Sequence, residues 1–485
     1  MFLFSFWKHF NHNLYLCPVI RRVLLFTLVI LFLQEPLTLF CQLNTRSQDA
    51  VHSHSTESLI IQEFKLLNGL KILMVPTNLD SGIVVNLLIK SGSNKDSIDK
   101  LGLAQQTAQH LIFNNQKEQQ RVLKALEIKL TVDVLPDSTI FRAVLFPERL
   151  KLFLKMLASS LTNPVVKLGM EKSVKNQTSI DDRVPEGLQL PHLYFKRAIF
   201  GDHPYGRIPR EVKVSPKDLY QFLSNHYIPN NASLIVVGSF SPKFLIKEIR
   251  ENFGPWTKKD LLHFTYPKFP RIDKLSIQLF SDEENSAQSG IVFGHTVPSR
   301  SSDDFYSLQA LNLILGGFSN GSRLSKAFST KKINYQFIDS QIEFYELGGL
   351  FRVLAKIPSE AATSALTTII ESIENLKQFP VTVSELELAK KNLLALEKAR
   401  LNSIYSIADK LTMMELFSLS KNPLENFPDE LQNLTAGQLQ RTAKLYLSTT
   451  RAVTIIRGID ERTFKDLNSL GSFEILTIPD LINVP

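Results

Sequence analysis

The chain has 485 residues, of which 44% are hydrophobic and 21% charged, a composition typical of a globular protein with two to four domains. Its formal charge is +8, and the basic residues are scattered rather than gathered in one run, which does not favour nucleic-acid binding. The only cysteines are Cys17 and Cys41. A mature chain that begins after them has no disulfide scaffold and no cysteine catalysis.

The N-terminal segment 1–43 predicts targeting. Arg21 and Arg22 precede an apolar run over 23–33, which matches the core of a signal peptide and is short for a bilayer span. Cleavage is expected near 41–43, and an uncleaved anchor is an alternative because no small-x-small cleavage site is present. We therefore expect an exported protein of a bacterial periplasm or envelope, with membrane contact only through this N-terminus.

The globular part is expected to follow a polar linker at 44–58. Residues 63–75 predict a β-hairpin, because two strand-like runs flank Asn68-Gly69, the strongest short hairpin signal. Residues 81–93 predict the next strand.

A helix is predicted at 101–113, because apolar residues recur there every three or four positions and so share one buried face. These residues are Leu101, Ala104, Ala108 and Leu111. A second amphipathic helix is predicted over 147–161. A capping box at 384–387 predicts a long helix over 386–404.

Three motifs along the chain resemble one family. Residues 66–70 are Leu-x-Asn-Gly-Leu, 203–206 are His-Pro-Tyr-Gly, and 227–232 are Tyr-x-Pro-x-Asn-Ala before an apolar strand that ends at Gly238. Together they are similar to the insulinase (pitrilysin) family of zinc metallopeptidases, over about residues 60–460. The resemblance implies an α+β fold of the kind found in mitochondrial processing peptidases.

An internal repeat divides the chain. Ser289-Gly290-Ile291-Val292 repeats Ser81-Gly82-Ile83-Val84, an offset of 289 − 81 = 208, and the strand ending at Gly458 repeats that ending at Gly238, an offset of 458 − 238 = 220. We predict two homologous halves, each an antiparallel-rich sheet with helices packed on one face. The expected parts are a domain over 59–256, a linker at 257–272, a domain over 273–470 and a tail at 471–485.

In the insulinase family, the helix that matches 101–113 carries Gly-x-Ala-His-x-x-Glu-His. Its two histidines hold zinc, and its glutamate activates the metal-bound water. Aligned from Gly102 and Ala104, the histidine positions hold Gln105 and Gln109, and the glutamate position holds Ala108. Amides are poor zinc ligands and a methyl group cannot move a proton, so the resemblance implies a catalytically degenerate member without a zinc cofactor.

Two residues remain weak candidates for metal binding. His110 lies one position beyond the second ligand, about 100° around the helix, and has no second ligand four residues away. The family's third ligand is the later of two glutamates about two turns apart. Glu171 matches the first, but the zinc-binding position holds Thr178, or Ser179 if the register slips by one.

The second half carries a further family signature. Residues 315–317 are Leu-Gly-Gly and 321–328 begin Gly-Ser-Arg-Leu. In active members an arginine and then a tyrosine follow and hold the substrate or the oxyanion, whereas here the arginine position is Ser329 and Tyr335 matches the tyrosine after one deletion. Together with the 203–206 loop, the resemblance implies four candidate substrate-binding residues: His203, Tyr205, Arg323 and Tyr335.

Three functions follow as hypotheses. The preferred one is a non-catalytic homologue that holds an extended polypeptide at a sheet edge by strand addition and completes the chamber of an active insulinase-type peptidase subunit. The second is an active zinc endopeptidase with ligands relocated to residues such as His110, Glu171 and His203. The third is a homodimeric scaffold without a peptidase partner, comparable to the core subunits of respiratory complexes that resemble the family.

Overall fold

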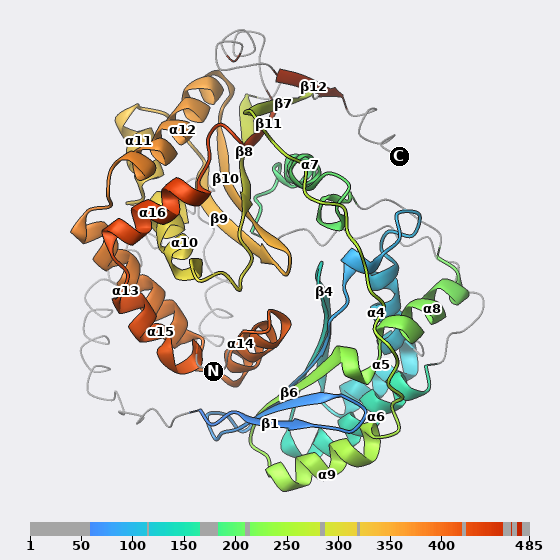
Figure 1. The fold of residues 1–485 in the computed structure, drawn as a ribbon. Coiled ribbons are helices and arrows are strands. Elements are labelled where there is room, and N and C mark those ends of the chain that lie inside the picture. Colours follow the sequence, from blue (N-terminus) through green and yellow to red (C-terminus); the bar gives the residue numbers. More distant parts are fainter. Residues whose placement is uncertain are drawn as a thin grey trace, which may run out of the picture. The chain divides into compact units, whose positions relative to one another are not determined.

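The computed structural model describes the chain in the ranges 59–113, 116–164, 183–208, 214–281, 287–317, 321–419, 423–458, 467 and 473–477. The predicted targeting segment and polar linker lie outside the described residues. Within the described part, every helix is too short or too polar to cross a membrane. Figure 1 traces the helices and strands.

The first sheet contains six strands in the spatial order β1-β2-β6-β3-β5-β4. Their bounds are β1 Gln62–Lys65, β2 Lys71–Pro76, β3 Ile83–Ile89, β4 Lys129–Val134, β5 Thr139–Leu145 and β6 Ala232–Gly238. Neighbouring strands are antiparallel, except that β2 runs parallel to β6. The predicted hairpin is confirmed: Gly69 lies in the β1–β2 turn with a φ of 93°, which glycine adopts without strain.

Five helices pack on one face of this sheet. They are α4 Leu103–Phe113, α5 Gln116–Ala125, α6 Leu150–Thr162, α8 Pro216–His226 and α9 Pro242–Phe253. Ile83, Val85 and Leu87 of β3 point into this core, because alternate side chains of a strand face the same way. The helix predicted at 101–113 is therefore α4, and that predicted at 147–161 is largely α6.

The second sheet has the order β12-β7-β11-β8-β10-β9. Its strands are β7 Ser276–Ser281, β8 Gln288–Val297, β9 Phe337–Tyr345, β10 Gly348–Pro358, β11 Val453–Arg457 and β12 Phe473–Thr477. The run β7-β11-β8-β10-β9 has the same order as β2-β6-β3-β5-β4, and β7 and β11 are likewise parallel. The predicted duplication is confirmed, because the repeated sequences lie on β3 and β8 and on β6 and β11. Since β12 falls inside the predicted tail, the second half extends at least to residue 477.

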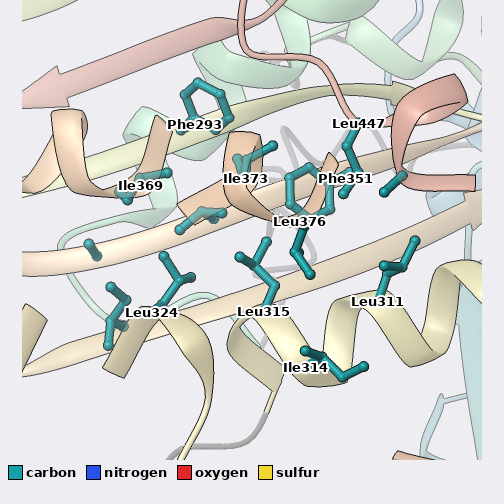
Figure 2. Close-up of a cluster of buried hydrophobic side chains, with 14 of the residues drawn as sticks. Phe293, Leu311, Ile314, Leu315, Leu324, Phe351, Ile369, Ile373, Leu376 and Leu447 are labelled. Atoms are coloured by element: carbon teal, nitrogen blue, oxygen red, sulfur yellow. The ribbon is translucent and has the colours of Figure 1, made fainter. Parts of the chain in front are cut away.

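The second half has its own hydrophobic core on one face of its sheet. Phe293 and Phe351 on the strands meet Leu324, Ile369 and Ile373 on the helices, as Figure 2 shows. The helices of this half that contribute to the core are α10 Phe305–Asn312, α11 Arg323–Thr330, α12 Ala362–Gln378, α13 Val383–Ala399, α15 Pro423–Gln432 and α16 Ala436–Tyr446. A π-helical turn, η5 Leu313–Gly317, carries the Leu-Gly-Gly signature.

One helix from each half packs on the sheet of the other half. The helix α7, Gln189–Phe200, contacts β8 and β11, and its Phe195 and Ile199 join a core with Val292 and Ile455. The helix α14, Ile404–Leu416, contacts β3 and β6. The opposite face of each sheet is therefore covered by a helix that comes from the other half, a long-range exchange that the repeat alone did not predict.

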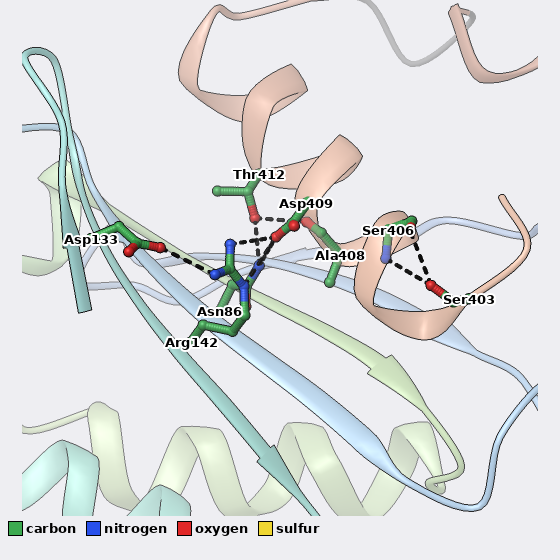
Figure 3. A network of polar contacts seen from close by, with 8 residues as sticks. All are labelled: Asn86, Asp133, Arg142, Ser403, Ser406, Ala408, Asp409 and Thr412. Atoms are coloured by element: carbon green, nitrogen blue, oxygen red, sulfur yellow. Dashed lines mark hydrogen bonds and ion pairs between the residues drawn. The ribbon is translucent and has the colours of Figure 1, made fainter. Parts of the chain in front are cut away.

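Polar contacts hold α14 on the first sheet, as Figure 3 shows. Asn86 of β3 donates to the Thr412 hydroxyl over 3.0 Å, and Arg142 of β5 contacts Asp409 at 2.6 Å. Arg142 also contacts Asp133 of β4 at 3.1 Å, so one guanidinium joins β4, β5 and α14. Both aspartates are about half exposed, and the pairs are therefore worth about 1 kcal/mol or less each.

The helix predicted over 386–404 has different bounds in the structure. The chain forms α13 up to Ala399 and then starts α14 at Ile404. The N-cap is Thr382 rather than Ser384, because the Thr382 hydroxyl accepts from the Glu385 N–H over 3.2 Å while the Glu385 carboxylate accepts from the Thr382 N–H over 2.9 Å.

Candidate functional site

The helix α4 carries the three residues that the sequence aligns with the family's zinc motif. Ala108 is fully buried in the core of the first half, whereas Gln105 and Gln109, one turn apart, are both partly exposed. Where the family has two histidines that bind a metal ion, this helix therefore carries two neutral amides. Where the family has a catalytic glutamate, the methyl group of Ala108 is enclosed by apolar side chains.

A buried carboxylate fixes the start of α4. Asp96 is 4% exposed, and its oxygens accept from the N–H groups of Gly102 at 2.7 Å and Ala104 at 2.8 Å. Burial raises the pKa of Asp96 to about 7, although these backbone donors and Arg207 act in the opposite direction. The sequence does not indicate this role of Asp96, since its partners lie six and eight positions away, farther than an ordinary capping box reaches.

The metal candidates do not form a site among the described residues. No three His, Cys, Asp or Glu side chains gather there in a group that could hold a metal ion. His110 lies on α4 and is partly exposed, while His203 belongs to a loop after α7 and is 2% exposed. Glu171 and Thr178 lie outside the described residues, so the third-ligand position stays a prediction.

An unpaired strand edge lies beside α4. The helix contacts β4, and within the described chain β4 pairs only with β5. Lys129, Thr131 and Asp133 are exposed, while Val132 and Val134 are partly buried against the core of the first half. The open edge of β4 therefore offers main-chain donors and acceptors that an added strand could pair with.

The loop at 203–206 forms part of the junction between the halves. Tyr205 donates to Asp137 over 2.6 Å, and the same carboxylate accepts from the backbone N–H of Glu346, in the β9–β10 turn, over 2.8 Å. The Tyr205 ring stacks on Tyr345 at 4.4 Å between centroids. The buried first-half loop is thus tied to the second half by hydrogen bonds and by ring contact.

His203 and Tyr205 face protein rather than solvent, with exposures of 2% and 3%. The His203 Nδ1 accepts from the Tyr205 N–H, and burial together with Arg207 lowers the pKa of His203 to about 4, so the ring is neutral near pH 7. A neutral imidazole used as a turn acceptor explains its position without a substrate. The predicted contact of these two residues with substrate remains a prediction.

Arg323 and Tyr335 belong to different contacts in the second half. Arg323 forms two parallel hydrogen bonds of 2.8 Å with Glu385, and these bonds are the main cause that lowers the pKa of Glu385 to about 2. Tyr335 is partly buried against the second-half core and meets the Phe328 ring edge-on, while Ser329 is exposed. Their predicted role in substrate binding also remains a prediction.

Comparison with known proteins agrees with this architecture. The family described as the peptidase M16 inactive domain matches residues 213–393. The zinc protease PqqE of Helicobacter pylori is 23% identical over 419 residues, which cover 80% of this chain and 91% of the relative. The uncharacterized zinc protease YmxG of Bacillus subtilis is 20% identical, covering 82% of this chain and 98% of the relative.

Solved structures share the fold. A peptidase M16 inactive domain from Pseudomonas fluorescens superposes with a TM-score of 0.73 at 20% identity, covering 83% of this chain and 98% of that one. A chain of complex III2 from Candida albicans superposes with a TM-score of 0.69 at 12% identity, covering 85% and 100%. The repeated α+β halves, the sequence motifs and these relatives make the chain similar to the insulinase-type, or M16, peptidases.

Proposed function

We propose that this chain is a non-catalytic member of that family and binds an extended polypeptide along the open edge of β4. The observation that carries the proposal is the composition of α4. The residues that align with the family's two zinc-binding histidines are Gln105 and Gln109, and the residue that aligns with its general base is Ala108. A peptide bound at the neighbouring edge would meet amides where an active peptidase needs a metal-bound water.

The open edge of β4 supports peptide binding independently of any metal. Main-chain hydrogen bonds to an edge strand provide affinity, and pockets for alternate side chains provide selectivity. Arg142 anchors Asp133 to α14, which braces β4 against the second half before a ligand arrives. A braced edge loses less conformational freedom on binding.

Proline substitutions test the edge directly. Consecutive N–H groups of a strand point to opposite sides, so one of the N–H groups of Thr131 and Val132 faces β5 and the other faces the open edge. Of the two variants Thr131→Pro and Val132→Pro, one therefore disrupts the pairing with β5, and the other removes only a donor of the open edge. We expect the better-folded of the two to weaken binding of a fluorescently labelled unfolded polypeptide about tenfold. On β1, the other edge of the same sheet, the better-folded of Glu63→Pro and Phe64→Pro is the matched control by the same reasoning, and it leaves affinity unchanged. Equal affinity of the chosen β4 variant, the chosen β1 variant and the unmodified chain would place the peptide elsewhere.

A second candidate is a metal-dependent peptidase with relocated ligands, and the zinc protease names of the relatives favour it. Such a site would have to recruit His110, His203 or the region around Glu171. Metal analysis of the purified full chain separates the two candidates. Tightly bound zinc in a one-to-one ratio supports the peptidase, whereas a chain that loses all zinc in a weak chelator supports the binding protein.

We further propose that the chain works with an active insulinase-type subunit in the bacterial envelope, its export directed by the N-terminal apolar segment. Purification from the native host followed by mass spectrometry tests this pairing: a co-purifying chain with an intact His-x-x-Glu-His motif is expected. The likeness to a chain of complex III2 favours the scaffold alternative. Isolation as a homodimer without any peptidase would support that scaffold instead.

A further inference from the structure

A cavity of about 450 Å³ lies at one end of the second sheet, and none of its lining residues belongs to α4 or β4. Three segments form its walls: residues 270–273 before β7, 295–298 around the end of β8, and residues 445–451 around the end of α16. The volume falls in the range of pockets that hold small molecules or the end of a peptide. The feature is thus large enough to hold a ligand of its own.

One of the residues that line the cavity is a buried, neutral histidine. His295 is 3% exposed; its Nε2 accepts from the Ser448 N–H over 3.1 Å, and its Nδ1 lies 3.0 Å from the Thr296 carbonyl oxygen. The proton therefore sits on Nδ1, because the carbonyl can only accept. Burial lowers the pKa of His295 to about 4, so at pH 7 the ring has neither a charge nor a spare donor for a ligand.

The charge of the cavity comes from Arg451. Its backbone N–H donates to the Ser448 hydroxyl, and within the described part of the chain its guanidinium makes no hydrogen bond or ion pair. The other arginine in the lining, Arg271, contacts Asp273 at 2.6 Å, so those two charges offset each other. The C-terminus of α16 adds a partial negative charge of about half an elementary charge from the helix dipole, which is smaller than the full positive charge of Arg451.

Apolar groups line the rest of the cavity. The walls include the apolar residues Ile272, Val297 and Pro298. Leu445 also lines the cavity, and 63% of its surface is exposed. A guanidinium presents parallel N–H groups that match the two oxygens of a carboxylate. A cavity with one such cation and several apolar groups suits an anion that carries an apolar group beside its charge.

We propose that this cavity binds a carboxylate joined to an apolar group, with Arg451 holding the carboxylate. This chemistry occurs at the C-terminus of a polypeptide that ends in an apolar residue, and also in short fatty acids. The site uses only second-half residues and the segment before β7, so it does not depend on peptide binding at β4.

Calorimetry on the full chain tests the proposal with three probes. N-acetyl-Ala-Ala-Leu with a free carboxylate is expected to bind, and its C-terminal amide at least about tenfold more weakly. Octanoate identifies the source: equal binding indicates any apolar carboxylate, whereas binding of the tripeptide alone indicates a peptide terminus. Equal affinity for the acid and the amide, or no heat from either carboxylate at millimolar concentration, would overturn the proposal.

Two arginine variants locate the binding. Arg451→Gln removes the unpaired charge and is expected to weaken tripeptide binding at least about tenfold. Arg271→Gln removes a guanidinium already engaged by Asp273 and should change affinity less than about threefold. Both side chains are exposed, so neither change should alter the thermal unfolding midpoint by more than about 2 °C. Unchanged affinity in a folded Arg451→Gln variant would refute the assigned role.

Discussion

Tyr205 of the first half donates its phenolic hydrogen to Asp137 over 2.6 Å, and the other oxygen of Asp137 accepts from a backbone N–H of the β9–β10 turn in the second half. Both side chains are buried, with exposures of 3% and 5%. Burial raises the pKa of Asp137, and the hydrogen bond from Tyr205 is the leading opposing influence. This tyrosine therefore stabilises a buried acid at the junction between the halves.

We expect Tyr205→Phe to lower the free energy of unfolding by about 2 kcal/mol, because a buried acid loses its strongest donor. Tyr220→Phe is the matched control, since Tyr220 is 57% exposed and should change stability by less than about 0.5 kcal/mol. Urea unfolding of both variants provides the measurement. A Tyr205→Phe protein as stable as the control would show that this contact contributes nothing to the junction.

Restoring the zinc motif tests the alignment of α4. We expect Gln105→His, Ala108→Glu, Gln109→His and Thr178→Glu together to create stoichiometric zinc binding, measured by metal analysis after gel filtration. Since Ala108 is fully buried, the new carboxylate should destabilise the metal-free variant by a few kcal/mol, and zinc should recover part of that loss.

The matched control for that variant is Gln106→His, which creates a pair with His110 four residues apart on a different face of α4. This pair lacks a third ligand in the predicted alignment and should not retain zinc through gel filtration. Zinc retained by the control but not by the fourfold variant would show that the alignment is out of register.

Acid should weaken the fold through buried histidines. Burial, with a smaller effect of Lys95, lowers the pKa of His226 from 6.5 to about 4, so the unfolded chain takes up a proton before the folded one does. Its contribution to stability is present above pH 6.5 and is lost as the pH falls toward 4. We expect the free energy of unfolding of His226→Gln to depend less on pH in this window than that of the unmodified chain, by up to a few kcal/mol. Parallel pH profiles would contradict this.

Asp96 should have the opposite effect. Its pKa is raised from 3.8 to about 7, chiefly by burial, so the folded chain keeps a proton that the unfolded chain has already lost. Its contribution to stability is present below pH 3.8 and is lost as the pH rises through 7. We expect Asp96→Asn, which stays neutral, to gain stability relative to the unmodified chain between pH 5 and 8. Denaturant midpoints across that range measure the difference, and a constant difference would show that Asp96 does not titrate there.

Local signals account for what the sequence could predict. Asn68-Gly69 indicates its hairpin because both residues favour that turn, and the spacing of Leu101, Ala104 and Ala108 indicates α4 because it matches one helix face. The error at α13 also has a local cause. Thr382 and Glu385 fit the same capping-box spacing as Ser384 and Glu387, and only the structure shows which pair closes.

Long-range contacts account for what was missed. The exchange of α7 and α14 between the sheets depends on pairs such as Asn86 with Thr412, which are 326 residues apart. The hydrogen bonds from the start of α4 to Asp96 and the place of Arg451 in the lining of the cavity likewise have no sequence signature, because each depends on how separate segments meet. For the same reason, the sequence predicted His203 and Tyr205 as site residues but not their burial.

One assay separates a polypeptide-binding protein from a peptidase: the purified full chain is incubated with an unfolded polypeptide, either with added zinc or with a chelator. Mass spectrometry of the polypeptide reports any cleavage, and fluorescence anisotropy reports binding in the same samples. We expect binding that the chelator does not change and a polypeptide that stays intact in both samples. Cleavage that needs zinc and stops with the chelator, in the absence of any second protein, would contradict this expectation.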